Sequence, residues 1–222
     1  MRSQRTRSSV CFALAAALVA SALGYAAPVR AAPREYRVDT ARSKLVVHVF
    51  RAGALSPMLH DHHFAATSWT ARTFDPERPS ETRALVIVQA SSLRDRQPAL
   101  SEKDRMKVDS QVQGPEILDA ARHPVIRFEL ERLELDPSSD PKKAFLRGEL
   151  VGTLELHGHT RRVTIPAAAR WSDDWLGVNG LVAFRQSDFG IEPYRKLGGA
   201  IAVQDGVEVE LSLRATREAE KE

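Results

Sequence analysis

The pattern that most constrains the fold is the alternation of apolar and charged residues in VIRFELERLEL, residues 125–135. Ile126, Phe128 and Leu130 share one face, and a charged residue stands between each pair. This period of two predicts a β-strand with one apolar face. Seven further segments are candidate strands, and with this one they predict about eight strands of an antiparallel sheet: 43–53, 64–74, 82–92, 145–158, 161–171, 175–185 and 206–216.

One stretch, near residues 98–121, does not alternate and is rich in charges and helix formers. Ser101 followed by acidic residues predicts a helix start, and Gly114-Pro115 predicts its end, with a second short helix from Pro115. The sequence therefore predicts an all-β, antiparallel barrel of about eight strands with a short helical insertion. Closure removes exposed edges, and a barrel of this size can hold one small ligand. A β-sandwich is the alternative.

The first 31 residues have the layout of a secretory signal peptide: Arg2, Arg5 and Arg7, then an Ala-rich apolar run, then a cleavage point after Ala31. We expect residues 32–222 to form one domain, exported to the periplasm or secreted, with no stable membrane insertion after cleavage. An uncleaved membrane anchor is the alternative.

The charge and cysteine content change when this leader is removed. The whole chain has 32 Lys and Arg, four of them in the leader, so 32 − 4 = 28 bases remain against 29 acids, a net charge of −1. This balance argues against nucleic acid as a partner. The single cysteine, Cys11, also lies in the leader, so the expected mature chain has no disulfide and no cysteine-ligated metal.

Four segments in one order resemble the YceI-like family: 36–53, 91–129, 148–169 with its Gly-x-Leu-x-Leu-x-Gly-x-Thr-Arg-x-Val pattern, and FRQSDFGI at 184–191. The resemblance implies a lipocalin-like barrel with an elongated apolar cavity that binds a polyisoprenoid or similar amphiphilic lipid. It implies a binding or carrier protein without a catalytic set, so no enzyme is expected. It also implies a possible homodimer.

The alternation supplies candidates for the inner face of this barrel. Each of them can equally fill a core, and the cavity itself follows from the resemblance. Gly148 and Gly152 share the apolar face of their strand, which indicates close approach or a bend. The candidate ligand-binding residues are Leu45, Val47, Val49, Val86, Val88, Ile126, Phe128, Leu150, Leu154 and Phe184.

Two further groups have both a structural and a functional interpretation. Basic residues in and before the insertion could bind a phosphate head group, but a solvated helix face with interleaved acids is favoured. Ser187–Ile191 is interpreted as a bend at Gly190, with Phe189 closing the barrel end. The basic residues are Arg94, Arg96, Lys103, Arg105 and Lys107.

The segment LSPMLHDHHF, residues 55–64, is the strongest departure from familiar members of the family, which have Gly-x-Phe here. In an extended chain His60 and His62 point to one face and could share a metal, although no cofactor is required. A third ligand would have to come from His48, His123, His157 or His159. Two alternative functions therefore stay open: a periplasmic metal- or haem-associated protein using His60 and His62, and a structural or stress-related envelope protein with a filled core.

Overall fold

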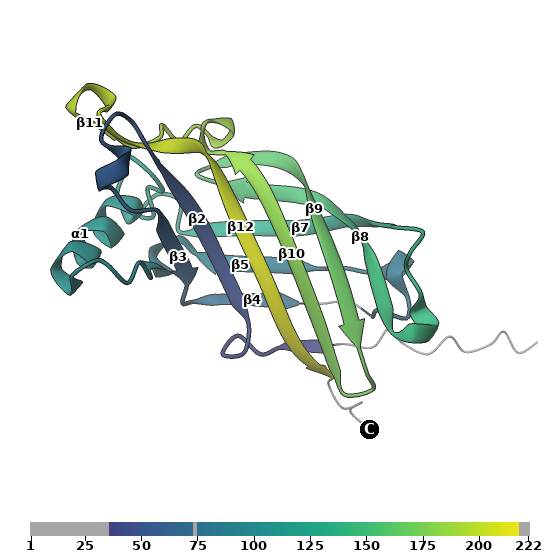
Figure 1. Ribbon diagram of the computed structural model, residues 1–222. Coiled ribbons are helices and arrows are strands. Elements are labelled where there is room, and N and C mark those ends of the chain that lie inside the picture. Colours follow the sequence, from purple (N-terminus) through teal and green to yellow (C-terminus); the bar gives the residue numbers. More distant parts are fainter. Residues whose placement is uncertain (1–35, 73–74, 218–222) are drawn as a thin grey trace, which may run out of the picture. The chain divides into compact units, whose positions relative to one another are not determined.

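The computed structural model describes residues 36–72 and 75–217 (Figure 1). Within them it has one α-helix, α1 (Glu102–Gln113), and short 3-10 turns such as η5 (Gln186–Phe189). The strands are β1 (Tyr36–Val38), β2 (Lys44–Ala52), β3 (His62–Ala66), β4 (Trp69–Arg72), β5 (Leu85–Gln89), β6 (Leu93–Asp95), β7 (Val125–Leu135), β8 (Phe145–Leu156), β9 (His159–Trp171), β10 (Trp175–Arg185), β11 (Arg195–Lys196) and β12 (Ile201–Arg217).

The sheet closes into a barrel. Antiparallel neighbours follow one another in the order β1-β4-β5-β7-β8-β9-β10-β12, and β1 pairs with β12 to complete the ring. These eight strands confirm the predicted antiparallel barrel, and the closure excludes the β-sandwich. A closed ring leaves no free edge along its length.

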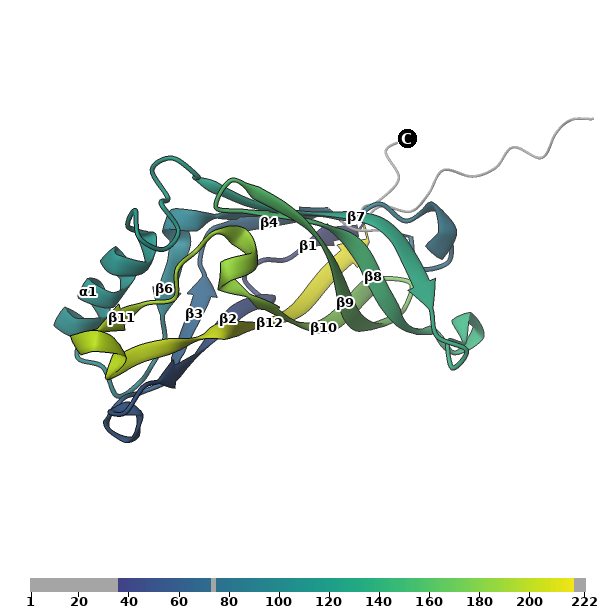
Figure 2. The same cartoon turned by 90° about the horizontal axis from the view of Figure 1, so that it is seen from above.

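Four further strands extend the sheet beside β12. β2 pairs with β12, β3 pairs with β2, and β6 pairs with β3, while β11 adds to β12. Both views of the ribbon place α1 at one end of the barrel, and α1 contacts β6 there (Figures 1 and 2). The helix therefore stands where the barrel interior would otherwise open.

Helix α1 begins and ends as the sequence predicts. The Ser101 hydroxyl accepts a hydrogen bond from the Asp104 amide at 3.2 Å, and Gly114 follows the last turn. The prediction of a second short helix from Pro115 is wrong. Hydrogen-bonded turns replace it, because Asp119 has a φ of +44°, in the left-handed region that interrupts a helix.

Strands β7 and β8 show why a glycine is required on the apolar face. Phe128 pairs with Leu154 in this ladder, and the register shifts between Leu130 and Arg132. A Cβ on Gly152 would lie 2.3 Å from the Glu129 carbonyl oxygen and 2.9 Å from the Phe128 ring. The close approach predicted for Gly152 is thus present, and it fixes the Phe128 ring against the strand.

Three apolar clusters occupy the interior. One packs Trp69 and Trp171 with Leu176, near the turn that joins β9 to β10. A second packs Phe64 and Phe189 with residues that follow α1. The third lies on β7, β8 and β9. Residues of all three clusters, among them Val88, Phe64 and Phe128, also border the cavity described below.

The expected signal peptide, residues 1–31, lies outside the described residues. Within residues 36–72 and 75–217, no helix combines the length and the apolar character that crossing a bilayer requires.

Candidate ligand-binding site

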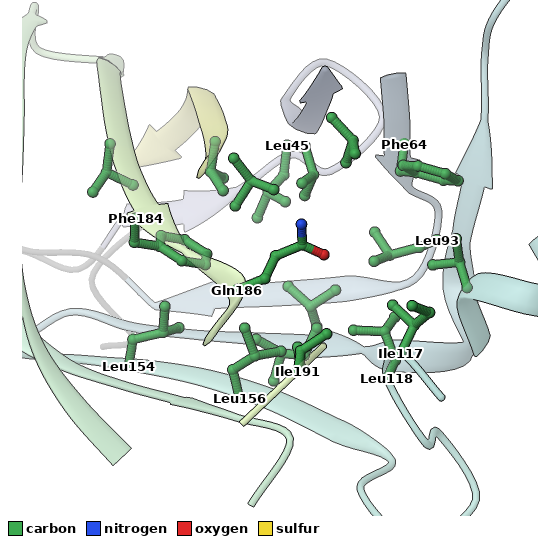
Figure 3. Close-up of a pocket in the computed structure, with 18 of the residues that line it drawn as sticks. Leu45, Phe64, Leu93, Ile117, Leu118, Leu154, Leu156, Phe184, Gln186 and Ile191 are labelled. Atoms are coloured by element: carbon green, nitrogen blue, oxygen red, sulfur yellow. The ribbon is translucent and has the colours of Figure 1, made fainter. Parts of the chain in front are cut away.

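A cavity of about 250 Å³ lies inside the barrel (Figure 3). All of its walls are apolar side chains except at His62, Gln111, Gln186 and Tyr194. The apolar lining consists of Leu45, Val47, Val49, Phe64, Val86, Val88, Leu93, Val108, Val112, Ile117, Leu118, Ile126, Phe128, Leu154, Leu156, Val163, Ile165, Val182, Phe184, Ile191, Val203, Val207, Val209 and Leu211.

Nine of the ten residues proposed from the alternation lie on this lining, and Leu150 does not. Leu150 is 8% exposed and stands opposite Leu133 and Ile165 in the ladders of β8. It packs among its neighbours and does not border the open space. The structure places the other nine at the cavity, and their contact with a ligand stays a prediction.

Several inward-facing side chains keep accessible surface. Val47, Val49, Val182 and Val209 line the cavity yet are only partly buried. In a filled interior such side chains would be covered by close-packed neighbours. The interior therefore has room for a ligand, which is the opposite of the filled core in one of the alternatives.

Residues outside the strands close one end of the cavity, and the alternation could not identify them. Val108, Gln111 and Val112 come from α1, whereas Ile117 and Leu118 come from the turns after it. Figure 3 shows Ile117, Leu118, Leu156 and Ile191 together along one side of the cavity. The strand residues Val182, Val207 and Val209 do alternate, and that signal could have found them.

Gln186 places an amide inside this apolar space. Its side chain reaches among the lining residues in Figure 3, and the residue is 8% exposed. The Nε2 group donates to the Gln204 carbonyl oxygen at 2.8 Å. This bond orients the amide, and Oε1 is then available to accept a hydrogen bond from a ligand hydroxyl.

His62 is a second polar group of the lining with a fixed partner. Its Nδ1 lies 2.6 Å from Oδ2 of Asp95, which is fully buried. Burial raises the pKa of Asp95, but hydrogen bonds from His62 and from the Gln97 amide, with the charge of His62, outweigh it and hold the pKa below its ordinary value. Asp95 is therefore an ionised acceptor, His62 donates through Nδ1, and Nε2 remains for a ligand.

The other histidines of residues 55–64 lie apart from this pair. His63 follows His62 on β3, and its Nδ1 is 2.9 Å from Nδ1 of His48, whose Nε2 is 3.5 Å from Glu210. His60 is exposed and precedes β3. Because Nδ1 of His62 is already bonded to Asp95, only its Nε2 could serve the metal site predicted at His60 and His62, which stays a prediction.

Three of the five basic residues in and before the insertion have partners within the protein. Arg94 lies 3.9 Å from Asp109, Lys107 lies 3.1 Å from Asp104, and Arg105 donates to the Gln97 carbonyl oxygen at 3.2 Å. These pairs agree with the favoured interpretation, a solvated helix face with interleaved acids. Because these side chains already have partners, the insertion is a poor candidate for a dedicated phosphate site.

The Ser187–Ile191 segment closes the barrel as the sequence predicts. Gly190 has a φ of +70°, and Phe189 is 1% exposed with its ring centroid 5.2 Å from that of Phe184. Asp188 is exposed. The segment is a bend with an aromatic plug, and Phe189 supports the lining residue Phe184 from behind.

Comparison with known proteins identifies the family. The model of the YceI-like domain matches residues 36–215. The chain belongs to the YceI-like family. No curated protein sequence matches this YceI-like chain.

Solved structures share the fold of this YceI-like protein. BcnA of Burkholderia cenocepacia is 22% identical with a TM-score of 0.62, over 81% of this chain and 99% of that one. A polyisoprenoid-binding domain from Saccharophagus degradans is 12% identical with a TM-score of 0.59, over 82% and 98%. The YceI protein of Campylobacter jejuni is 16% identical with a TM-score of 0.52, over 69% and 83%. At these identities the likeness concerns the barrel and not its ligand.

Proposed function

We propose that this YceI-like protein is an exported carrier that holds a polyisoprenoid or similar amphiphilic lipid inside its barrel. The observation that carries the proposal is the cavity, whose walls are apolar apart from four polar side chains. The Saccharophagus degradans relative of the same fold is described as a polyisoprenoid-binding domain, which supports the ligand class.

The energetics favour a chain of hydrocarbon over a compact polar ligand. Transfer of apolar surface from water contributes about 25 cal/mol per Å², or roughly 0.8 kcal/mol for each buried CH₂ group, before the costs of association. A branched isoprenoid chain offers such surface along its whole length. A sugar or nucleotide would leave its polar groups unpaired against these walls.

The cavity volume limits how such a lipid is held. About 250 Å³ is slightly below the range of about 300–1,000 Å³ that is common for small-molecule pockets. We expect a long chain to push the walls apart or to leave part of its length outside.

The polar groups suit recognition of a head group better than catalysis. Within the described residues, no serine, threonine or cysteine lines the cavity, and no hydroxyl is hydrogen-bonded to His62. The His62–Asp95 pair therefore has no nucleophile to activate. Gln186 and His62 can instead bind the hydroxyl or carbonyl oxygen of a lipid.

Equilibrium binding tests this function. Delipidated protein is titrated with a polyprenol, and bound lipid is measured by native mass spectrometry. We expect saturable binding of one molecule per chain. Absence of binding, or unsaturable uptake typical of a nonspecific surface, would contradict the proposal.

Export and self-association are tested separately. The leader predicts that the exported protein begins at Ala32, which the mass of protein recovered from the periplasm or medium measures. The homodimer implied by the family is measured by sedimentation of the same sample.

A further inference from the structure

Three potential metal ligands meet beside the cavity, away from His60 and His62 in the sequence. They are Asp119, His123 and His157, and one ligand atom of each lies within 4.8 Å of the other two. In residues 36–72 and 75–217 no other group of three or more such side chains gathers as closely. Two imidazoles and a carboxylate are the ligand set of open zinc sites.

The turns after α1 fix the first two ligands. The His123 amide donates to the Asp119 carbonyl oxygen at 2.8 Å, and the Asp119 amide donates to the Gly114 carbonyl oxygen at 2.8 Å. Asp119 has a φ of +44° in this turn. The backbone thus holds a carboxylate and an imidazole four residues apart on one side of a tight turn.

The β8–β9 hairpin supplies the third ligand. Its two-residue loop is His157-Gly158, with φ values of +52° and +74°, as a type I′ turn requires. A Cβ on Gly158 would lie 2.7 Å from the His123 ring, so the hairpin packs directly on that imidazole. The His123 and His157 ring centroids are 5.1 Å apart.

An outer hydrogen bond selects the tautomer of His157. Its Nδ1 lies 3.3 Å from the Phe189 carbonyl oxygen, which can only accept. The proton therefore sits on Nδ1 and the lone pair on Nε2. Histidines that bind metals commonly donate their second ring nitrogen to a carbonyl in this way.

The buried carboxylate of Asp119 needs a positive partner, and Arg122 supplies it in this structure. This carboxylate is 4% exposed, and its ion-pair partner is Arg122, whose side chain is 75% exposed. A buried carboxylate is stable only when it is paired. The Arg122 side chain can turn into solvent, so a metal ion could replace it without leaving a buried charge.

We propose that Asp119, His123 and His157 bind a divalent transition metal, with zinc the best match to two nitrogens and one oxygen. The ion joins the α1–β7 connection to the β8–β9 hairpin. Leu118 and Leu156, the neighbours of two ligands, line the lipid cavity. The metal therefore rigidifies one wall of that cavity.

Calorimetric titration of the full chain with zinc chloride tests the site. We expect one zinc per chain, and an affinity lower by about 100-fold or more in His123→Ala, Asp119→Asn and His157→Asn. Asparagine is chosen at residues 119 and 157 because it tolerates a positive φ, so both turns can form. Circular dichroism and thermal unfolding without zinc check that each variant is folded.

Two controls sharpen the test. Arg122→Ala removes the competing cation and is expected to tighten zinc binding about two- to fivefold. His60→Ala leaves the His62–Asp95 pair intact and is expected to bind zinc like the wild type. Absence of stoichiometric zinc binding by the wild type would overturn the proposal. Retention of affinity by His157→Asn with loss in His60→Ala would place the metal elsewhere and also overturn it.

Discussion

Nδ1 of His62 donates to Oδ2 of Asp95 at 2.6 Å, and the carboxylate that accepts this bond is fully buried behind the cavity wall. Asp95 also connects the helix to the barrel, since the Asp95 backbone amide donates to Oδ1 of Asp109 on α1 at 2.7 Å. One aspartate thus orients the histidine at the cavity and holds α1 over the barrel end.

Asp95→Asn is expected to destabilise the fold by about 1–3 kcal/mol, because an amide cannot replace the ionised acceptor of several hydrogen bonds. Urea unfolding at neutral pH measures the loss of unfolding free energy. Asp104→Asn is the control, since Asp104 is exposed on α1 and its substitution is expected to leave stability nearly unchanged. Equal losses in the two variants would contradict the importance of Asp95.

The stability of the wild type should also fall in acid. The pKa of Asp95 is lower in the folded protein than its ordinary value of about 3.9. Its stabilising contribution is therefore complete above the ordinary value and is lost as the pH falls through the lower folded value. The unfolding free energy of Asp95→Asn should lack this part of the pH dependence. Parallel curves for the two proteins would refute the assignment.

Val47→Phe is expected to weaken polyprenol binding about tenfold or more. The added ring occupies cavity space, and displacing two CH₂ groups of the lipid costs roughly 1.6 kcal/mol at ~0.8 kcal/mol each. The matched control is Val46→Phe, one residue earlier on β2 and absent from the lining. Native mass spectrometry with the polyprenol compares them. Similar affinities for the two variants would mean that the lipid binds outside the barrel.

Gln186→Leu tests recognition of the lipid hydroxyl. The Gln186 amide is held by the Gln204 carbonyl oxygen, and loss of its acceptor should reduce polyprenol affinity by about 0.5–1.5 kcal/mol. Affinity for an isoprenoid hydrocarbon of equal length should stay unchanged. Leu154→Ala, which removes only apolar contact, should weaken both ligands together. An equal loss of both ligands in Gln186→Leu would show that the amide has no part in head-group recognition.

Gly152→Ala is expected to destabilise the barrel by about 1–3 kcal/mol, because the new methyl group meets the Glu129 carbonyl oxygen and the Phe128 ring. Gly206→Ala is a matched control, since a Cβ there has nothing within 4 Å and the residue also lies in a strand. Thermal unfolding compares the variants. Equal unfolding temperatures for Gly152→Ala and Gly206→Ala would show that β7 and β8 accommodate the methyl group without loss of stability.

Alternation predicted the barrel because the side chains of a strand must divide between interior and solvent. It placed Val47 and Val49 on the inner face correctly. It could not tell Leu150, packed between Leu133 and Ile165, from residues that border open space, since both kinds face inward. Whether a cavity remains depends on how side chains from different strands fill the interior.

Contacts between distant residues were beyond the sequence pattern. Asp95 meets His62 from 33 positions away, and nothing local in LRD marks that partner. Ile117 and Leu118 reach the cavity from irregular turns without periodicity. The sequence pattern indicates His123 and His157 only as further ligands for the His60 and His62 site, whereas the fold brings them to each other and to Asp119.

The most direct test of the central claim is organic extraction of protein purified from its native source, followed by mass spectrometry of the extract. We predict an isoprenoid or similar amphiphilic lipid in near-stoichiometric amount from the wild type and a much smaller amount from Val47→Phe. A wild-type extract without lipid, from protein that is folded and has never been delipidated, would contradict the account.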